Sequence, residues 1–154
     1  MSNFEFLKPE FPALADTAIG AESILNIYPQ AALMSARQSL ETLVLWLYRY
    51  DKKLTQPYDA KLQNLLNDAT FRQIIPTYIW EKMDALRMAG NQAVHGKNFS
   101  KIQPADAAKY ISHLFLIYVW FERTYGRPDP SRPSARLYNR QLIPGNASAA
   151  TADS

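Results

Sequence analysis

Apolar side chains recur along the chain at intervals of three and four residues, with no run of strict apolar–polar alternation. This is the period of an amphipathic α-helix, so the pattern predicts an all-α protein. Long helices are expected over residues 12–26, 29–51, 77–94 and 104–125. Three of them begin with proline (Pro12, Pro29 and Pro104), which loses no needed hydrogen bond at the first helical position.

Two shorter helices are expected over residues 61–67 and 70–75, between the second and third long helices. The second long helix carries a regular apolar stripe, typical of a helix packed against others. Its members are Leu33, Ala36, Leu40, Leu43, Val44 and Leu47. The third helix is expected to stop at Gly96, before a loop over residues 97–103. The sequence therefore predicts an up-and-down bundle of four main helices with short extra helices between the second and third.

The last predicted helix contains an eight-residue apolar run, from Leu114 to Phe121. A helix that is apolar on every side is usually enclosed by other helices or buried in a dimer. After Gly126 the composition changes to Arg, Pro and Ser. We therefore expect a helical domain over residues 1–126, an Arg- and Pro-rich strap or linker over 127–144, and a disordered tail over 145–154.

Composition and charge narrow the function. The chain has 154 residues, no cysteine and two histidines, which excludes a disulfide scaffold, a thiolate metal site and a cysteine nucleophile. Residues 1–121 carry 12 basic and 11 acidic side chains, so a nucleic-acid-binding face on the core is poorly supported. The N-terminus lacks the pattern of a signal peptide, and the longest apolar run is far shorter than a bilayer span. We expect a cytoplasmic protein with no metal or cofactor of its own.

Three polar side chains are regularly spaced on the third long helix. Arg87, Asn91 and His95 are spaced four residues apart, which places them on one stripe of that helix. His95 can serve as an acid or base near neutral pH while Arg87 holds a phosphate. The alternative is structural, with Asn91 and His95 fixing the turn to the next helix. The spacing alone favours the structural interpretation.

Arg37 and Glu41 form an i, i+4 pair on the second long helix, whose apolar neighbours indicate burial. A solvated pair of this kind contributes only a few tenths of a kcal/mol. A buried pair facing the third helix would reach Asn91 or His95. The five residues together would then form a polar network, and Glu41 would be the carboxylate partner of a catalytic His95.

Two segments of the chain resemble a known family. The run Gly90-Asn91-Gln92-Ala93-Val94-His95, after Arg87, is similar to the signature of the HEPN-like accessory domain at the N-terminus of type I restriction endonuclease subunits. Residues 36–41 and 46–49 resemble that family's second helix. Residues 3–7 and 140–144 also fit, so the likeness extends over almost the whole chain.

The resemblance implies a non-catalytic assembly or regulatory domain within a subunit that couples ATP-driven DNA translocation to cleavage. Its partners would be other subunits or domains of a restriction complex, or a second copy in a homodimer, with DNA contacted only through the parent complex. The chain itself has no phosphate-binding loop, helicase motif or clustered nuclease residues. The wider superfamily also includes metal-independent ribonucleases, which would use His95 and Arg87. Seven residues separate Arg87 from His95, one more than that motif allows.

Overall fold

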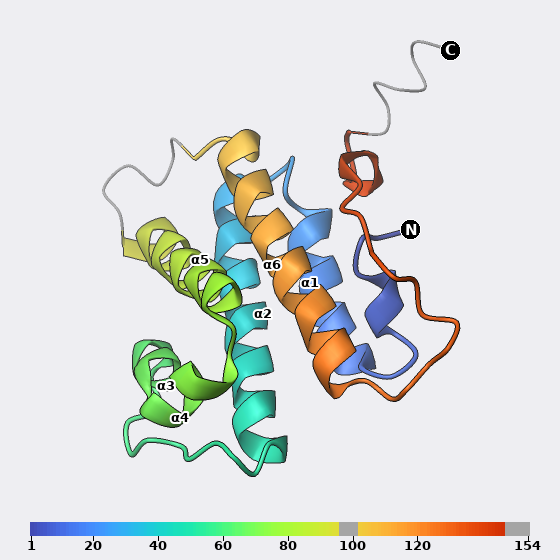
Figure 1. Ribbon diagram of the computed structural model, residues 1–154. Helices are drawn as coiled ribbons and strands as arrows, with labels where there is room; N and C mark the ends of the chain where they lie inside the picture. Colours follow the sequence, from blue (N-terminus) through green and yellow to red (C-terminus); the bar gives the residue numbers. More distant parts are fainter. Residues whose placement is uncertain (96–101, 147–154) are drawn as a thin grey trace.

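The computed structural model describes residues 1–95 and 102–146, and every regular element in these ranges is a helix (Figure 1). The four long helices are α1 (Pro12–Ser23), α2 (Pro29–Tyr50), α5 (Thr77–His95) and α6 (Pro104–Tyr125). Consecutive long helices run in opposite directions, so the predicted up-and-down helical bundle is observed. The short helices α3 (Leu62–Asn67) and α4 (Ala69–Ile74) lie between α2 and α5, as predicted. One-turn 3-10 helices, η1 (Glu5–Leu7) and η3 (Arg140–Leu142), lie near the two ends of the chain.

Local signals in the sequence fix where these helices begin. Proline occupies the start of α1, α2 and α6. Asp68 caps α4, because its carboxylate accepts from the backbone N–H groups of Thr70 and Phe71. At α6, the Asp106 carboxylate accepts from the backbone N–H of Gln103 at 3.0 Å. The long helices therefore begin at the predicted residues.

Helix α2 is at the centre of the bundle and packs against α1, α5 and α6. The predicted stripe from Leu33 to Leu47 is buried along its whole length. The apolar run of α6 is covered on most sides, and Leu114, Phe115, Ile117, Tyr118 and Phe121 are all buried. Val119 and Trp120 are only partly buried, and Leu116 has 41% of its surface exposed. One side of α6 is therefore not covered within a single chain.

Both ends of the described chain pack on the bundle. Phe4 and Leu7 are fully buried, and the Phe4 ring contacts the rings of Phe115 and Tyr118, each at 6.1 Å between centroids. Residues 127–144, called here the C-terminal strap, run back along the bundle past η1 (Figure 1). Ile143, near the end of the strap, is fully buried. The strap is therefore part of the folded domain rather than a free linker.

The segment predicted to be a tail begins with two ordered residues. The Asn26 side chain donates to the Pro144 carbonyl at 2.7 Å and to the Asn146 side chain at 3.0 Å. Gly145 adopts a positive φ of 97°, which a side chain would disfavour, and an added Cβ would lie 3.1 Å from Asn26 Nδ2. The rest of the predicted tail, 147–154, lies outside the described residues. So do the predicted stop at Gly96 and most of the loop that follows it.

Candidate functional site

The stripe of Arg87, Asn91 and His95 lies on α5, but its members do not meet. The Arg87 guanidinium pairs with Asp84 one turn earlier, with Nε 3.0 Å and Nη2 2.9 Å from Asp84 Oδ1. The Arg87 side chain is only 13% exposed. Asn91 is half-buried, and His95 is exposed at the last residue of the helix. Among the described residues, none donates to or accepts from the side chains of Asn91 and His95.

Arg37 and Glu41 form the predicted pair on α2, with 3.3 Å between Arg37 Nη1 and Glu41 Oε2. The pair is not buried: its side chains are 27% and 37% exposed. Although α2 is the central helix, the side chains of this pair are only partly covered by α5 and remain in contact with solvent. In the part of the chain that the structure describes, no hydrogen bond joins this pair to Arg87, Asn91 or His95. The five residues therefore do not form one network: Arg37 pairs with Glu41, and Arg87 pairs with Asp84 instead. Asn91 and His95 take part in neither pair.

Gly90 explains how the two helices approach each other. A Cβ added to this glycine would lie 2.5 Å from Arg37 Cβ, 2.7 Å from Cδ and 2.9 Å from Cγ. The aliphatic stem of Arg37 therefore occupies the space that any other residue at position 90 would fill. The motif glycine is required by close α2–α5 packing. Nearby, Gln30 at the start of α2 donates to the Ala93 carbonyl of α5 at 2.7 Å, which fastens the same two helices again.

The geometry limits what chemistry this face can perform within one chain. Eight residues of α-helix span about 12 Å along the axis, so Arg87 and His95 lie more than two turns apart. A phosphate bound to Arg87 would have to displace Asp84. His95 is exposed, and no residue within 1–95 and 102–146 forms a hydrogen bond or ion pair with its side chain. The face holds two structural ion pairs and one accessible imidazole.

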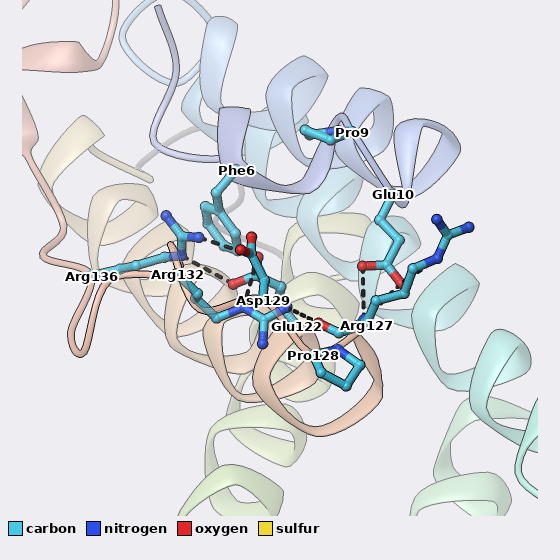
Figure 2. Close-up of a pocket in the computed structure, with 9 residues that line it drawn as sticks. All are labelled: Phe6, Pro9, Glu10, Glu122, Arg127, Pro128, Asp129, Arg132 and Arg136. Atoms are coloured by element: carbon cyan, nitrogen blue, oxygen red, sulfur yellow. Dashed lines mark hydrogen bonds and ion pairs between the residues drawn. The ribbon is translucent and has the colours of Figure 1, made fainter.

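A second polar cluster, which the sequence analysis did not predict, joins the C-terminal strap to α6 (Figure 2). Glu122 is a buried carboxylate with 10% of its side chain exposed. Arg136 approaches it with Nε 3.0 Å from Oε1 and Nη2 3.2 Å from Oε2. Arg132 adds a third contact, with Nε 3.4 Å from Oε2. One carboxylate thus binds two guanidinium groups, which are 16% and 20% exposed.

These groups line an open pocket of about 440 Å³ between η1, the end of α6 and the strap (Figure 2). The Arg136 guanidinium also lies over the Phe6 ring, 4.5 Å from its centroid. On the other side of the pocket, Glu10 accepts from the backbone N–H of Arg127 at 3.0 Å. The guanidinium groups of Arg127, Arg132 and Arg136 all contact carboxylates or rings of the protein itself. We therefore interpret the cluster of Glu122, Arg132 and Arg136, called here the strap latch, as a contact that holds the strap on α6 rather than as a ligand-binding site.

A third cluster ties the N-terminus to the strap around Glu22, which is 2% exposed. Ser2 Oγ donates to one carboxylate oxygen at 2.5 Å, and Asn3 Nδ2 donates to the other at 2.8 Å. Asn3 also exchanges two hydrogen bonds with the Asn139 backbone, at 2.9 and 2.7 Å. Burial, together with the negative charge of Glu22, raises the pKa of Tyr138 to about 12. The buried carboxylate is thus stabilised by neutral donors that hold both chain ends.

Two features of the sequence could have indicated this cluster of Glu122 with the strap arginines. Glu122 ends the longest apolar run of the chain, where a solitary carboxylate would be costly to bury alone. The five arginines that follow it supply an excess of partners. The pattern cannot say which arginines reach Glu122, because that depends on how the strap turns after Gly126.

The fold and these clusters define an all-helical bundle whose C-terminal segment closes over it. Residues 20–140 match the family described as a domain of unknown function, DUF4145, so the chain belongs to that family. No curated protein and no solved structure shows a significant match to the chain. Within residues 1–95 and 102–146, no helix is both long and apolar enough to cross a bilayer. In the same ranges, no group of three or more His, Asp or Glu side chains is placed to hold a metal ion.

Proposed function

We propose that this chain is a non-catalytic assembly or regulatory domain of a type I restriction endonuclease subunit, as its resemblance to the HEPN-like accessory domain implies. The parent would carry out ATP-dependent DNA translocation and cleavage in the cytoplasm. This domain would contact other subunits, the parent's motor, or a second copy of itself. DNA would be reached only through the parent complex.

The observation that supports this proposal is that Arg87 is already engaged in an ion pair within its own helix. The guanidinium that a nuclease would need as a phosphate clamp is 13% exposed and bound to Asp84. A catalytic pair requires both groups to converge on one reacting atom, and the helical rise keeps His95 about 12 Å away along the axis. A domain that acts by contact needs no such convergence.

The alternative is a metal-independent ribonuclease that uses His95 as acid or base and Arg87 as clamp. One observation favours it: His95 is exposed at the end of α5, where a second copy of the chain can approach it. In that arrangement Glu41 would be the carboxylate that orients the imidazole. The two functions therefore differ in whether His95 is needed for a reaction.

The experiment compares the parent subunit with a form that lacks this domain. We expect the truncated parent to keep its ATPase activity but to lose stable assembly with its partner subunits, measured by size-exclusion chromatography with light scattering. Unchanged assembly and unchanged cleavage would contradict the proposal. In parallel, the purified chain is incubated with single-stranded RNA in EDTA. Cleavage by the wild type that His95→Ala abolishes would favour the ribonuclease instead.

A further inference from the structure

A shallow groove of about 330 Å³ lies on the surface between α5 and α6, closed along one edge by the strap. Its floor combines aliphatic and aromatic side chains. The side chains that form it are Tyr78, Ile79, Leu116, Val119 and Trp120. This is where the all-round apolar run of α6 is left uncovered. Tyr78 and Leu116 are 62% and 41% exposed, although both lie beside buried neighbours. Apolar side chains gathered in one groove typically mark a binding surface.

The charges around the groove have one sign. Lys82, Arg123 and Arg136 line it, and no acidic side chain does. The Arg123 guanidinium is held by the backbone carbonyls of Pro133 and Ser134, which fix its position without neutralising its charge. Lys82 makes no ion pair with any described residue. Arg136 shares Glu122 with Arg132. Hydrogen bonds from Ser131, and then the charges of both arginines, lower the pKa of Asp129 beside them. The unpaired positive charge of the groove therefore rests on Lys82 and Arg123.

A neighbouring side chain supports this picture of the electrostatic field. His113 on α6 is half-buried and lies next to the Tyr110 ring. Burial lowers its pKa, and the positive charges of Lys82 and Lys109 lower it further. The basic character of the face therefore extends along α6 beyond the groove.

We propose that this groove binds an acidic amphipathic helix of a partner protein. The apolar side of such a helix would rest on Leu116 and Trp120, while its carboxylates would lie over Lys82 and Arg123. Helices with a regular apolar face commonly dock into grooves of this kind, and complementary charge sets their orientation. The inference rests on the proposed function as an assembly domain and names the chemistry of the partner. Tyr78 and Trp120 offer a stacking surface to single-stranded nucleic acid. The aliphatic Ile79, Leu116 and Val119 do not, so the apolar side of a helix fits the floor as a whole better.

The test measures binding of the full 154-residue chain to a fluorescein-labelled, 18-residue helical probe peptide. The probe has leucines at helical spacing and glutamates on both flanks. A matched peptide replaces every glutamate by lysine, and a 12-residue oligothymidylate represents nucleic acid. We expect binding of the acidic peptide alone, weakened about 10-fold by Lys82→Glu and by Leu116→Gln. Because both residues are partly exposed, thermal melts of the two variants should match the wild type.

The chain offers matched controls for both variants. Leu45 on α2 is 41% exposed, as is Leu116, and Lys52 lies just after α2, so Leu45→Gln and Lys52→Glu should leave binding unchanged. Equal binding of the acidic and basic peptides, or an acidic-peptide affinity unaffected by Lys82→Glu, would overturn the proposal. So would oligothymidylate binding that depends on Lys82, or self-association of the chain that Leu116→Gln abolishes. If the groove binds the acidic peptide as described but the parent assembles without this domain, only the assembly function fails.

Discussion

Ion pairs and polar contacts are concentrated on two faces of this bundle. The two faces differ in how far apart along the chain the contacting residues lie. On the α2–α5 face, both ion pairs join residues three or four positions apart on one helix, Arg37 with Glu41 and Arg87 with Asp84. On the strap face, Glu122 of α6 binds arginines of the strap, and Asn3 bonds to Asn139, 136 positions away. The sequence motif drew attention to the first face. The contacts that close the fold are on the second.

The contribution of each ion pair to the free energy of unfolding depends on how deeply the pair is buried. An exposed pair within one helix contributes about 0.2–0.5 kcal/mol. Removing one partner of a buried pair costs about 3–5 kcal/mol, because it leaves a charge in the interior without compensation. Glu41 is 37% exposed, whereas Glu122 is 10% exposed. The Arg87–Asp84 pair, with side chains 13% and 24% exposed, lies between these two cases, so the energetic weight follows the burial of each pair rather than the face that carries it.

The largest effect should follow from removing the strap. A chain ending at Arg127 loses the buried Ile143 and leaves Glu122 without either arginine. Burial of one large aliphatic side chain contributes about 1.5–3 kcal/mol, so the total loss should exceed about 4 kcal/mol. A chain ending at Asn146 is the control and should melt like the full protein. Equal thermal midpoints for all three chains would show that the strap adds nothing to the fold.

The next effect compares the two carboxylates directly. Glu122→Gln should lower the free energy of unfolding by about 3 kcal/mol, since Arg132 and Arg136 lose their shared counter-charge in a buried site. Glu41→Gln should change it by less than about 0.5 kcal/mol. Chemical denaturation with urea measures both. Similar losses for the two variants would remove the distinction between the faces.

Two glycines provide a matched pair for the packing of α2 against α5. Gly90→Ala places a methyl group 2.5 Å from Arg37 Cβ, at the rigid base of that side chain. We expect a net loss of about 1–2 kcal/mol, because overpacking outweighs the gain in helix propensity. Gly20→Ala on α1 meets nothing within 4 Å and should instead stabilise the protein by about 1 kcal/mol. If Gly90→Ala also raised the melting temperature, the close approach of the helices would be disproved.

The smallest effect is expected at the residue that the motif makes most conspicuous. The sequence favours a structural role for His95, but the side chain is exposed and bonds to no described residue. His95→Ala should therefore change the free energy of unfolding by less than about 0.5 kcal/mol. The measurement is a urea titration at pH 7, with Arg87→Ala as the comparison. A loss above 1 kcal/mol for His95→Ala would restore the structural interpretation.

Most of the fold could be predicted, since its signals are local. Proline starts and the 3.6-residue period placed the long helices within a few residues of their observed bounds. The buried stripe of α2 followed from the same period. The candidate site could be predicted only as a set of positions. The spacing put Arg87, Asn91 and His95 on one helix, but Arg87 pairs with Asp84 of the same helix, and no described residue bonds to the side chains of Asn91 and His95.

The sequence by itself determined the helical class, the order and extent of the helices, and the Arg37–Glu41 pair, because each depends on residues within a turn or two of one another. The tertiary structure alone decided that Arg37 lies against Gly90, that Glu122 receives Arg132 and Arg136, and that Asn3 meets Asn139. Those contacts join segments whose approach depends on how the whole bundle closes. The same closure left the α5–α6 groove uncovered, because the strap reaches its edge without covering Leu116.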